Sequence, residues 1–175
     1  MKESVSGLTL VGRARHASAI LLASVLVVVS GLLPTPAGAI TRSDVLARAH
    51  SWVAKRVIYS QRSTHGGYRR DCSGFVSMAW RLGTSYTSRT IHKVATRISI
   101  SKLRAGDAVH TPGHVAIFVR WKSKAKRTYV AMEESRRGKP AMHHVRKIGR
   151  GATALRYHQV TDTPRFVVTV APTIL

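Results

Sequence analysis

Acidic residues are scarce in this chain of 175 residues, and cysteine occurs once. Seven Asp and Glu stand against 29 Lys and Arg, so the formal net charge is +22. One cysteine excludes an internal disulfide, a thiolate-rich zinc site and a cysteine-ligated iron–sulfur cluster. No internal repeat and no glycine-rich phosphate loop is present in the sequence. Because 44% of the residues are apolar, the composition predicts a single small globular domain that is strongly basic.

The first 39 residues have the pattern of a secretory signal peptide. Basic residues precede an apolar run over 18–33, and the small residues 37–39 fit a cleavage site. A transmembrane anchor is the weaker alternative, because the run is shorter than the roughly 20 residues that span a bilayer. We therefore expect removal of residues 1–39, a secreted or cell-wall location without a stable membrane anchor, and a mature domain over 40–175 with a basic C-terminal extension.

The periodicity of the mature chain predicts helices first and an antiparallel sheet afterwards. Helical spacing of apolar residues predicts a helix over 44–58 with Ser43 as its N-cap, and a second over 72–82 that Gly83 ends. A loop is expected over 59–70. Strands are predicted over 103–109, 114–121, 128–133, 142–148 and 166–170. This order is typical of an α+β domain in which N-terminal helices pack on a small antiparallel sheet.

The lone cysteine falls at the start of the second predicted helix. Unpaired backbone N–H groups and the positive end of the helix dipole favour a thiolate there, and Arg69 and Arg70 add positive charge just upstream of Cys72. A buried cysteine that packs as a small hydrophobic residue is the structural alternative. The position therefore makes Cys72 a candidate nucleophile.

A cysteine nucleophile needs a base that later protonates the leaving amine, and histidine fits that role near neutral pH. His114 is the best candidate, because it follows Pro112-Gly113 and opens the clearest predicted strand. The other histidines, His144 among them, lie on a helix face, in loops or among charged residues. They are interpreted as solvated surface side chains.

A carboxylate partner for His114 follows from hairpin register. A tight turn centred on Ser123-Lys124 pairs His114 directly with Glu133, and directly paired residues project from the same face of the sheet. Glu134 takes this place instead if the loop is odd in length or a strand carries a bulge. A solvated pair of glutamates at a strand end is the alternative without a function.

Three sequence elements together are similar to a known family. Asp71-Cys72-Ser73-Gly74-Phe75-Val76, Leu103-Arg104-Ala105-Gly106-Asp107-Ala108 and Gly113-His114-Val115-Ala116-Ile117-Phe118 resemble, in order and spacing, the NlpC-type family of papain-like cell-wall cysteine peptidases. The resemblance implies a papain-like α+β fold with Cys72 as nucleophile, His114 as general base and Glu133 at the third, polar position. It also implies substrate-binding roles for Tyr59, Asp71 and Ser73, of which Asp71 and Ser73 contact the free amine of the stem peptide.

The resemblance implies a secreted cysteine peptidase that hydrolyses peptidoglycan, with no metal and no cofactor. The bond expected is the amide between D-glutamate and a diamino acid, with the muramoyl–alanine amide as the alternative. Peptidoglycan and anionic cell-wall polymers are the expected partners of so basic a chain. A polyanion-binding or wall-binding domain without catalysis is the rival from another class. We expect no nucleic-acid partner, because no nucleic-acid-binding motif is recognised, and we expect a monomer.

Overall fold

A computed structural model describes residues 38–162 of the chain. The predicted signal peptide, apart from its last two residues, and the predicted strand over 166–170 lie outside the described residues. The elements, in chain order, are β1 (Ile40–Thr41), α1 (Arg42–Ala54), β2 (Ser60–His65), β3 (Tyr68–Arg70), α2 (Cys72–Ala79), the 3-10 helix η1 (Ile91–Val94), β4 (Ala95–Ile98), the 3-10 helix η2 (Ile100–Lys102), β5 (Ala108–Thr111), β6 (His114–Ser123), β7 (Thr128–Glu133), β8 (Met142–Lys147), β9 (Thr153–Tyr157) and β10 (Val160–Thr161). In this part of the chain no helix is long and apolar enough to cross a membrane.

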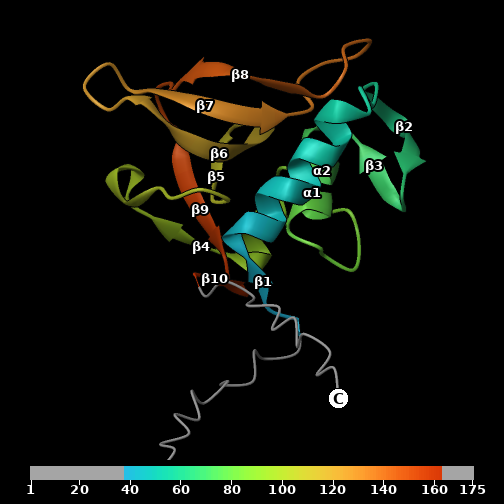
Figure 1. Ribbon diagram of the computed structural model, residues 1–175, viewed down its shortest axis with the longest axis horizontal. Coiled ribbons are helices and arrows are strands. Elements are labelled where there is room, and N and C mark those ends of the chain that lie inside the picture. The colour runs from blue at the N-terminus through green and yellow to red at the C-terminus, as the bar shows by residue number, and fades with distance from the viewer. Residues whose placement is uncertain (1–37, 163–175) are drawn as a thin grey trace, which may run out of the picture. The chain divides into compact units, whose positions relative to one another are not determined.

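The main sheet has six strands in the order β4-β9-β5-β6-β7-β8, and every neighbouring pair is antiparallel. Two small sheets complete the described residues: β1 pairs in parallel with β10, and β2 pairs with β3 as a hairpin. Figure 1 shows α1 and α2 beside the sheet, with the β2–β3 hairpin on their far side. The domain is therefore a mixed helix-and-sheet fold whose sheet is larger than the sequence predicts.

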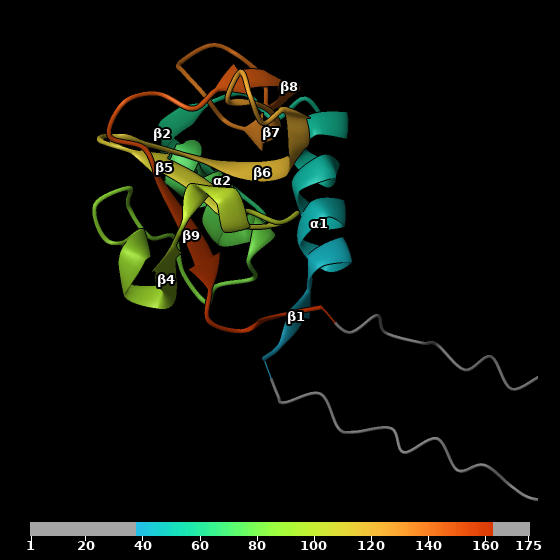
Figure 2. The same cartoon turned by 90° about the vertical axis from the view of Figure 1, so that its left-hand side faces the viewer.

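Alternation along β6 supplies apolar groups to both faces of the sheet. Val115 and Ile117 belong to the cluster that contains the helix residues Trp52 and Phe75. Phe118 belongs to a second cluster on the other face, where its ring stacks on Tyr129 with centroids 5.6 Å apart. Because both faces are covered, β6 is a central and rigid strand, and Figure 2 shows α1 running along the edge of this layered arrangement. The backbone of His114, the first residue of β6, is therefore held in a fixed position.

The helix boundaries differ from the prediction by a few residues. Thr41, rather than Ser43, caps α1, because its extended backbone lets its Oγ1 accept from Asp44 N at 3.1 Å. The second helix begins at Cys72 as predicted, but it ends at Ala79 instead of Leu82. Arg81 adopts a positive φ of 56° directly after the helix, which stops it before Gly83 is reached.

The predicted loop over 59–70 is a β-hairpin, so that prediction is wrong. Gly66 and Gly67 form its turn with φ of +57° and +83°, a pair of values that favours glycine and suits a two-residue hairpin loop. Strand β2 is polar and largely exposed and β3 is half-buried with two arginines, so both lack the alternating apolar residues by which strands are predicted. This hairpin carries the chain to the start of α2.

The strands over 114–123, 128–133 and 142–147 confirm the predicted strands, whereas two others differ. The strand predicted over 103–109 is replaced by β5, because Asp107 closes a turn in which its Oδ2 accepts from Arg104 N at 2.9 Å. Strand β9, which pairs with both β4 and β5, was not predicted.

The β6–β7 hairpin has a different register from the one predicted. Ile117 pairs with Met132, two irregularities follow toward the turn, and residues 124–127 connect the strands. The direct pairing of His114 with Glu133 is therefore wrong. Continuing the observed register by one residue places Ala116 opposite Glu133, and His114 lies on the same face as Ala116. His114 and Glu133 are thus diagonal neighbours on one face.

Candidate active site

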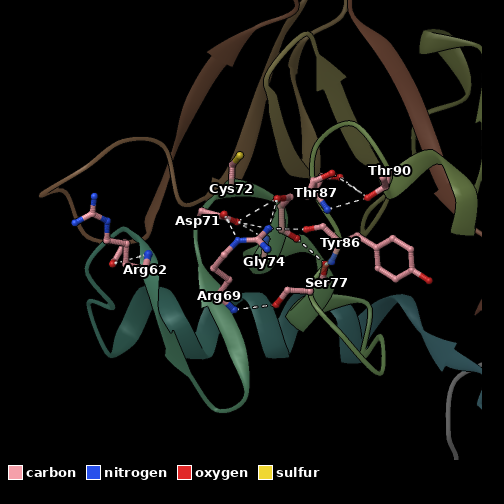
Figure 3. A network of polar contacts seen from close by, with 12 residues as sticks. Arg62, Arg69, Asp71, Cys72, Gly74, Ser77, Tyr86, Thr87 and Thr90 are labelled. Atoms are coloured by element: carbon pink, nitrogen blue, oxygen red, sulfur yellow. Dashed lines mark hydrogen bonds and ion pairs between the residues drawn. The ribbon is translucent and has the colours of Figure 1, made fainter.

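The N-terminus of α2 places the sulfur of Cys72 at the edge of the main sheet. Asp71 is the N-cap of this helix, and its Oδ1 accepts from Gly74 N at 2.7 Å. Cys72 is therefore in the first turn, where backbone N–H groups have no partner within the helix. Its side chain points toward the strands, and Sγ lies 3.9 Å from the carbonyl oxygen of Gly113 (Figure 3).

Gly74 allows strand β3 to approach α2 closely. A Cβ at this position would lie 1.8 Å from the backbone oxygen of Arg69, a distance that no side chain tolerates. The missing side chain thus brings Arg69 against the first turn of the helix, next to Asp71 and Cys72. The role of this glycine is backbone packing, rather than the reduction of bulk beside the sulfur.

His114 lies between Cys72 and Glu133. Its Nε2 is 2.7 Å from Glu133 Oε2, and Arg146 Nη1 lies 3.3 Å from the same nitrogen. The Cys72 side chain is among the groups that raise the pKa of the ring. Burial of His114 opposes its charged form, but the hydrogen bonds with Cys72 and Glu133 and the charge of Glu133 outweigh burial and raise its pKa to about 9. The imidazole is therefore protonated at neutral pH.

Glu133 is fully buried and is surrounded by basic side chains. Besides His114, its Oε1 accepts from His144 Nε2 at 2.8 Å, and Arg146 Nη1 lies 2.6 and 2.7 Å from its two oxygens. Burial raises the pKa of Glu133, but the hydrogen bonds and charges of His114 and Arg146 reverse this and lower it to about 2. The carboxylate is thus ionised and held in one orientation against the imidazole.

Glu134, the sequence alternative for the third position, is also fully buried but has a different environment. Neither of its carboxyl oxygens has a hydrogen-bond partner within residues 38–162. Burial raises its pKa to about 8, although the charge of Arg70 acts in the opposite direction. The structure therefore places Glu133, and not Glu134, against His114.

A pocket of about 270 Å³ opens beside Cys72. Its lining combines the hairpin, the start of α2, the segment after α2 and the turn before β6, and consists of Tyr59, Gln61, Arg69, Asp71, Cys72, Ser73, Thr87, Ser88 and Gly113. All three residues to which the sequence assigns substrate binding line this pocket. Burial is the main cause that raises the pKa of Tyr59, and the charge of the neighbouring Cys72 raises it further.

Arg69 forms a network with the two polar residues that flank Cys72. It is ion-paired to Asp71 through Nε, and its Nη2 donates to Ser73 Oγ at 3.1 Å and to the Tyr86 carbonyl at 2.8 Å. Ser73 Oγ in turn donates to Asp71 Oδ1 at 3.1 Å. Figure 3 shows this guanidinium among Asp71, Gly74 and Tyr86, below the sulfur. The sequence indicated only that Arg69 adds charge upstream of Cys72.

Sequence reasoning missed His144 and Arg146 as members of the site. The sequence signal that could have found them is the alternation in the predicted strand over 142–148. This alternation places the even-numbered residues on one face of the strand. Strand β8 pairs Ala131 with His144 and Tyr129 with Arg146, so both side chains share the face of Glu133. The pairing of β7 with β8 was not predictable from periodicity, and the interpretation of His144 as a solvated side chain was wrong.

Comparisons with known proteins give information about the fold of this chain. The sequence matches no family model and no curated protein. A solved structure of the resuscitation promoting factor interacting protein RipA, mutated at a histidine, is similar with a TM-score of 0.52 and 20% sequence identity. The similarity covers 74% of this chain and 67% of that chain and shows that the two chains have a similar fold. In the described part of the chain, no group of three or more His, Cys, Asp or Glu residues is arranged to hold a metal ion.

Proposed function

We propose that the protein is a secreted cysteine peptidase that hydrolyses amide bonds in peptidoglycan stem peptides. The observation that carries the proposal is the contact of 2.7 Å between the buried Glu133 carboxylate and the ring of His114, whose pKa the Cys72 side chain also raises. The sulfur lies at a helix N-terminus, which favours a thiolate, and Cys72 lines a pocket, which gives a substrate access. The NlpC-like fold and the three sequence motifs support the same assignment.

The acylation step uses the proton that His114 holds. Cys72 Sγ attacks the amide carbonyl carbon, and the backbone N–H groups in the first turn of α2 stabilise the oxyanion. The C–N bond breaks as the His114 imidazolium donates its proton to the departing amine. A thioester on Cys72 and a neutral imidazole remain, and Glu133 keeps the ring in the orientation needed for the second step.

The deacylation step restores the starting protonation state. Neutral His114 takes a proton from water, and the resulting hydroxide attacks the thioester carbonyl. The C–S bond breaks, the acid product leaves, and a Cys72 thiolate faces a His114 imidazolium again. The sum of the two steps is the addition of one water molecule across one amide bond, and neither step requires a metal ion or a cofactor.

The proposed bond joins D-glutamate to a diamino acid, on the strength of the motif resemblance, and the muramoyl–alanine amide is the second choice. The charge of +22 supports action at the cell wall, because stem peptides and anionic wall polymers attract a basic protein. The signal-peptide pattern of residues 1–39 supports secretion. We propose that the protein resides in the wall as a monomer, with peptidoglycan and anionic polymers as its partners.

Mass analysis of muropeptides released from purified walls of known stem composition tests the function. The wild-type protein is expected to release fragments whose masses identify the cleaved bond, while Cys72→Ala and His114→Ala release at least about a thousandfold less. His158→Ala, at an exposed histidine away from the pocket, is the matched control and should behave like the wild type. Release by Cys72→Ala at the wild-type rate would refute the proposal.

A wall-binding domain without catalysis is the second candidate, and the basic surface favours it. Lys122 near the end of β6 and Lys124 and Lys126 in the β6–β7 turn are exposed, and so are Arg136 and Arg137 after β7. A pure binder would sediment with walls at low salt, equally as wild type and as Cys72→Ala, and it would release no fragments. Salt-sensitive sedimentation accompanied by Cys72-dependent release distinguishes the enzyme from the binder.

A further inference from the structure

The pocket beside Cys72 has no carboxylate free to receive a positively charged group. Among the described residues that line it, Asp71 alone carries a carboxylate, and both of its oxygens are engaged. Oδ1 accepts from Gly74 N and Ser73 Oγ, and Oδ2 accepts from Arg69 Nε. Asp71 is itself almost fully buried, with 5% of its surface exposed. An incoming ammonium would have to approach this carboxylate against the positive charge of Arg69, whose guanidinium contacts both of its oxygens.

Arg69 brings the opposite charge to the pocket wall. Its backbone N–H donates to Ser85 Oγ at 2.8 Å, and its Nε and Nη2 are used by Asp71, Ser73 and the Tyr86 carbonyl. These contacts hold the guanidinium in one place. No atom in residues 38–162 accepts from Nη1, and 27% of the Arg69 side chain is exposed. The two Nη1 hydrogens are therefore free to bind a ligand oxygen.

We infer that Arg69 makes this pocket select a carboxylate next to the scissile bond and that the pocket does not recognise a free amine. The motif resemblance implied an amine contact for Asp71 and Ser73, but in this chain the guanidinium of Arg69 already donates to both side chains. A fixed guanidinium with a free Nη1 suits a carboxylate, because charge-assisted hydrogen bonds of this kind are short and strong. The inference rests on the proposed function and specifies its substrate class.

The substrate class is an acidic stem peptide whose N-terminus is acylated. In a peptide with a γ-linked D-glutamyl residue, the residue that supplies the scissile carbonyl also carries an α-carboxylate. That group lies close enough to the scissile amide for a side chain beside the nucleophile to bind it. An α-carboxamide in its place offers no negative charge. A stem peptide still attached to the glycan has no free N-terminal amine, which fits a pocket without a free carboxylate.

Four synthetic peptides test the inference. Each has the sequence L-Ala-γ-D-Glu-diamino acid with the same scissile amide; the D-glutamyl α-group is a carboxylate or a carboxamide, and the N-terminus is free or acetylated. For the wild-type enzyme we expect kcat/KM to be about tenfold or more higher for the carboxylate than for the carboxamide. Acetylation of the N-terminus should lower kcat/KM by less than about twofold. A tenfold preference for the carboxamide or for the free amine would overturn the inference.

Variants assign the preference to Arg69. Arg69→Gln should reduce the carboxylate-to-carboxamide ratio to about one to two, and Arg69→Lys should leave an intermediate ratio because the charge remains without the planar fork. Arg62→Gln is the matched control: Arg62 lies on the same hairpin, does not line the pocket and points away from it in Figure 3. It should retain the wild-type ratio. Because each ratio is taken within one protein, a loss of folded enzyme cancels. A wild-type ratio in Arg69→Gln would overturn the assignment.

A binding measurement separates this inference from the proposed function. Calorimetric titration of Cys72→Ala with the same peptides should give a Kd about tenfold lower for the carboxylate form, and Arg69→Gln in that background should abolish the difference. If the wild type hydrolyses nothing while this binding preference persists, the proposed function fails and the inference stands. If hydrolysis depends on Cys72 but neither rate nor binding depends on the carboxylate, the inference fails and the function stands. Absence of binding and of hydrolysis alike counts against both.

Discussion

At the residue scale, Glu133 combines full burial with three basic partners, and these two conditions set the protonation states of the site. The ionised carboxylate raises the pKa of His114, and the cations around it lower the pKa of Glu133. The stability from Glu133 is present above its unfolded pKa near 4.5 and is lost as pH falls toward 2. The stability from His114 is present below its unfolded pKa near 6.5 and is lost as pH rises through about 9. Both contributions are complete only between these unfolded values.

Glu134 makes an opposite contribution, and its replacement gives a prediction at the residue scale. Its pKa rises from 4.5 when unfolded to about 8 when folded, so between these values only the unfolded chain loses its proton. The free energy of unfolding should therefore fall as pH rises, by up to about 1.4 kcal/mol per pH unit from this group. Glu134→Gln is neutral at every pH and should be more stable than the wild type at pH 8 but not at pH 4.

Urea unfolding at several pH values measures this difference. Asp162→Asn is the matched control, because ion pairing with Arg42 lowers the pKa of that exposed carboxyl and keeps it ionised throughout this range. Its stability relative to the wild type should change little between pH 5 and pH 8. A Glu134→Gln variant whose relative stability is also constant over that range would show that Glu134 is not protonated in the folded protein.

At the element scale, the contact between strand β3 and helix α2 positions both Cys72 and Arg69, and a substitution of Gly74 tests this contact. Alanine is the better helix former by about 1 kcal/mol, so propensity alone predicts stabilisation. Because a Cβ at Gly74 would meet the Arg69 carbonyl, we expect Gly74→Ala to be destabilised by about 2 kcal/mol or more. The measurement is the midpoint of thermal or urea unfolding.

Gly83→Ala is the control for this substitution, because nothing lies within 4 Å of a Cβ built there. It should change the free energy of unfolding by less than about 0.5 kcal/mol. If Gly74→Ala is as stable as Gly83→Ala, β3 does not lie against the first turn of α2, and the placement of Arg69 is wrong.

The elements also show what periodicity could predict. Buried positions need apolar residues, and these residues are visible in the sequence. The alternation in β6 and β7 and the apolar residues of α2 could therefore be predicted. The strands of the β2–β3 hairpin are polar, so they have no apolar alternation by which they could be predicted. The register of β6 with β7 depends on irregularities near the turn. A shift of register by an even number keeps a residue on its face, and for this reason the contact between His114 and Glu133 could be anticipated from an incorrect pairing.

At the scale of the whole molecule, the site joins four separated segments: the hairpin, the start of α2, the start of β6 and the β7–β8 pair. Local motifs predicted Cys72 and His114, and a hairpin register that differs from the observed one by two residues predicted Glu133. Arg69, His144 and Arg146 could not be found in the same way, since each enters through a tertiary contact: a backbone packed on Gly74, or a strand paired with β7. The net charge of +22 belongs to the whole chain. It predicts a basic surface that attracts anionic polymers, but it does not locate the candidate active site.

The most direct test of this account is a titration of the His114 ring by NMR in the wild-type protein, with the signal assigned by its absence from His114→Ala. The site as described requires an imidazolium that persists to a pKa of about 9, because a hydrogen-bonded sulfur and an ionised Glu133 both favour the charged ring. That value, with a fall of at least about one unit in Glu133→Gln, is the predicted result. A His114 ring that titrates at or below 6.5 in the wild type would contradict the proposed arrangement of nucleophile, base and carboxylate.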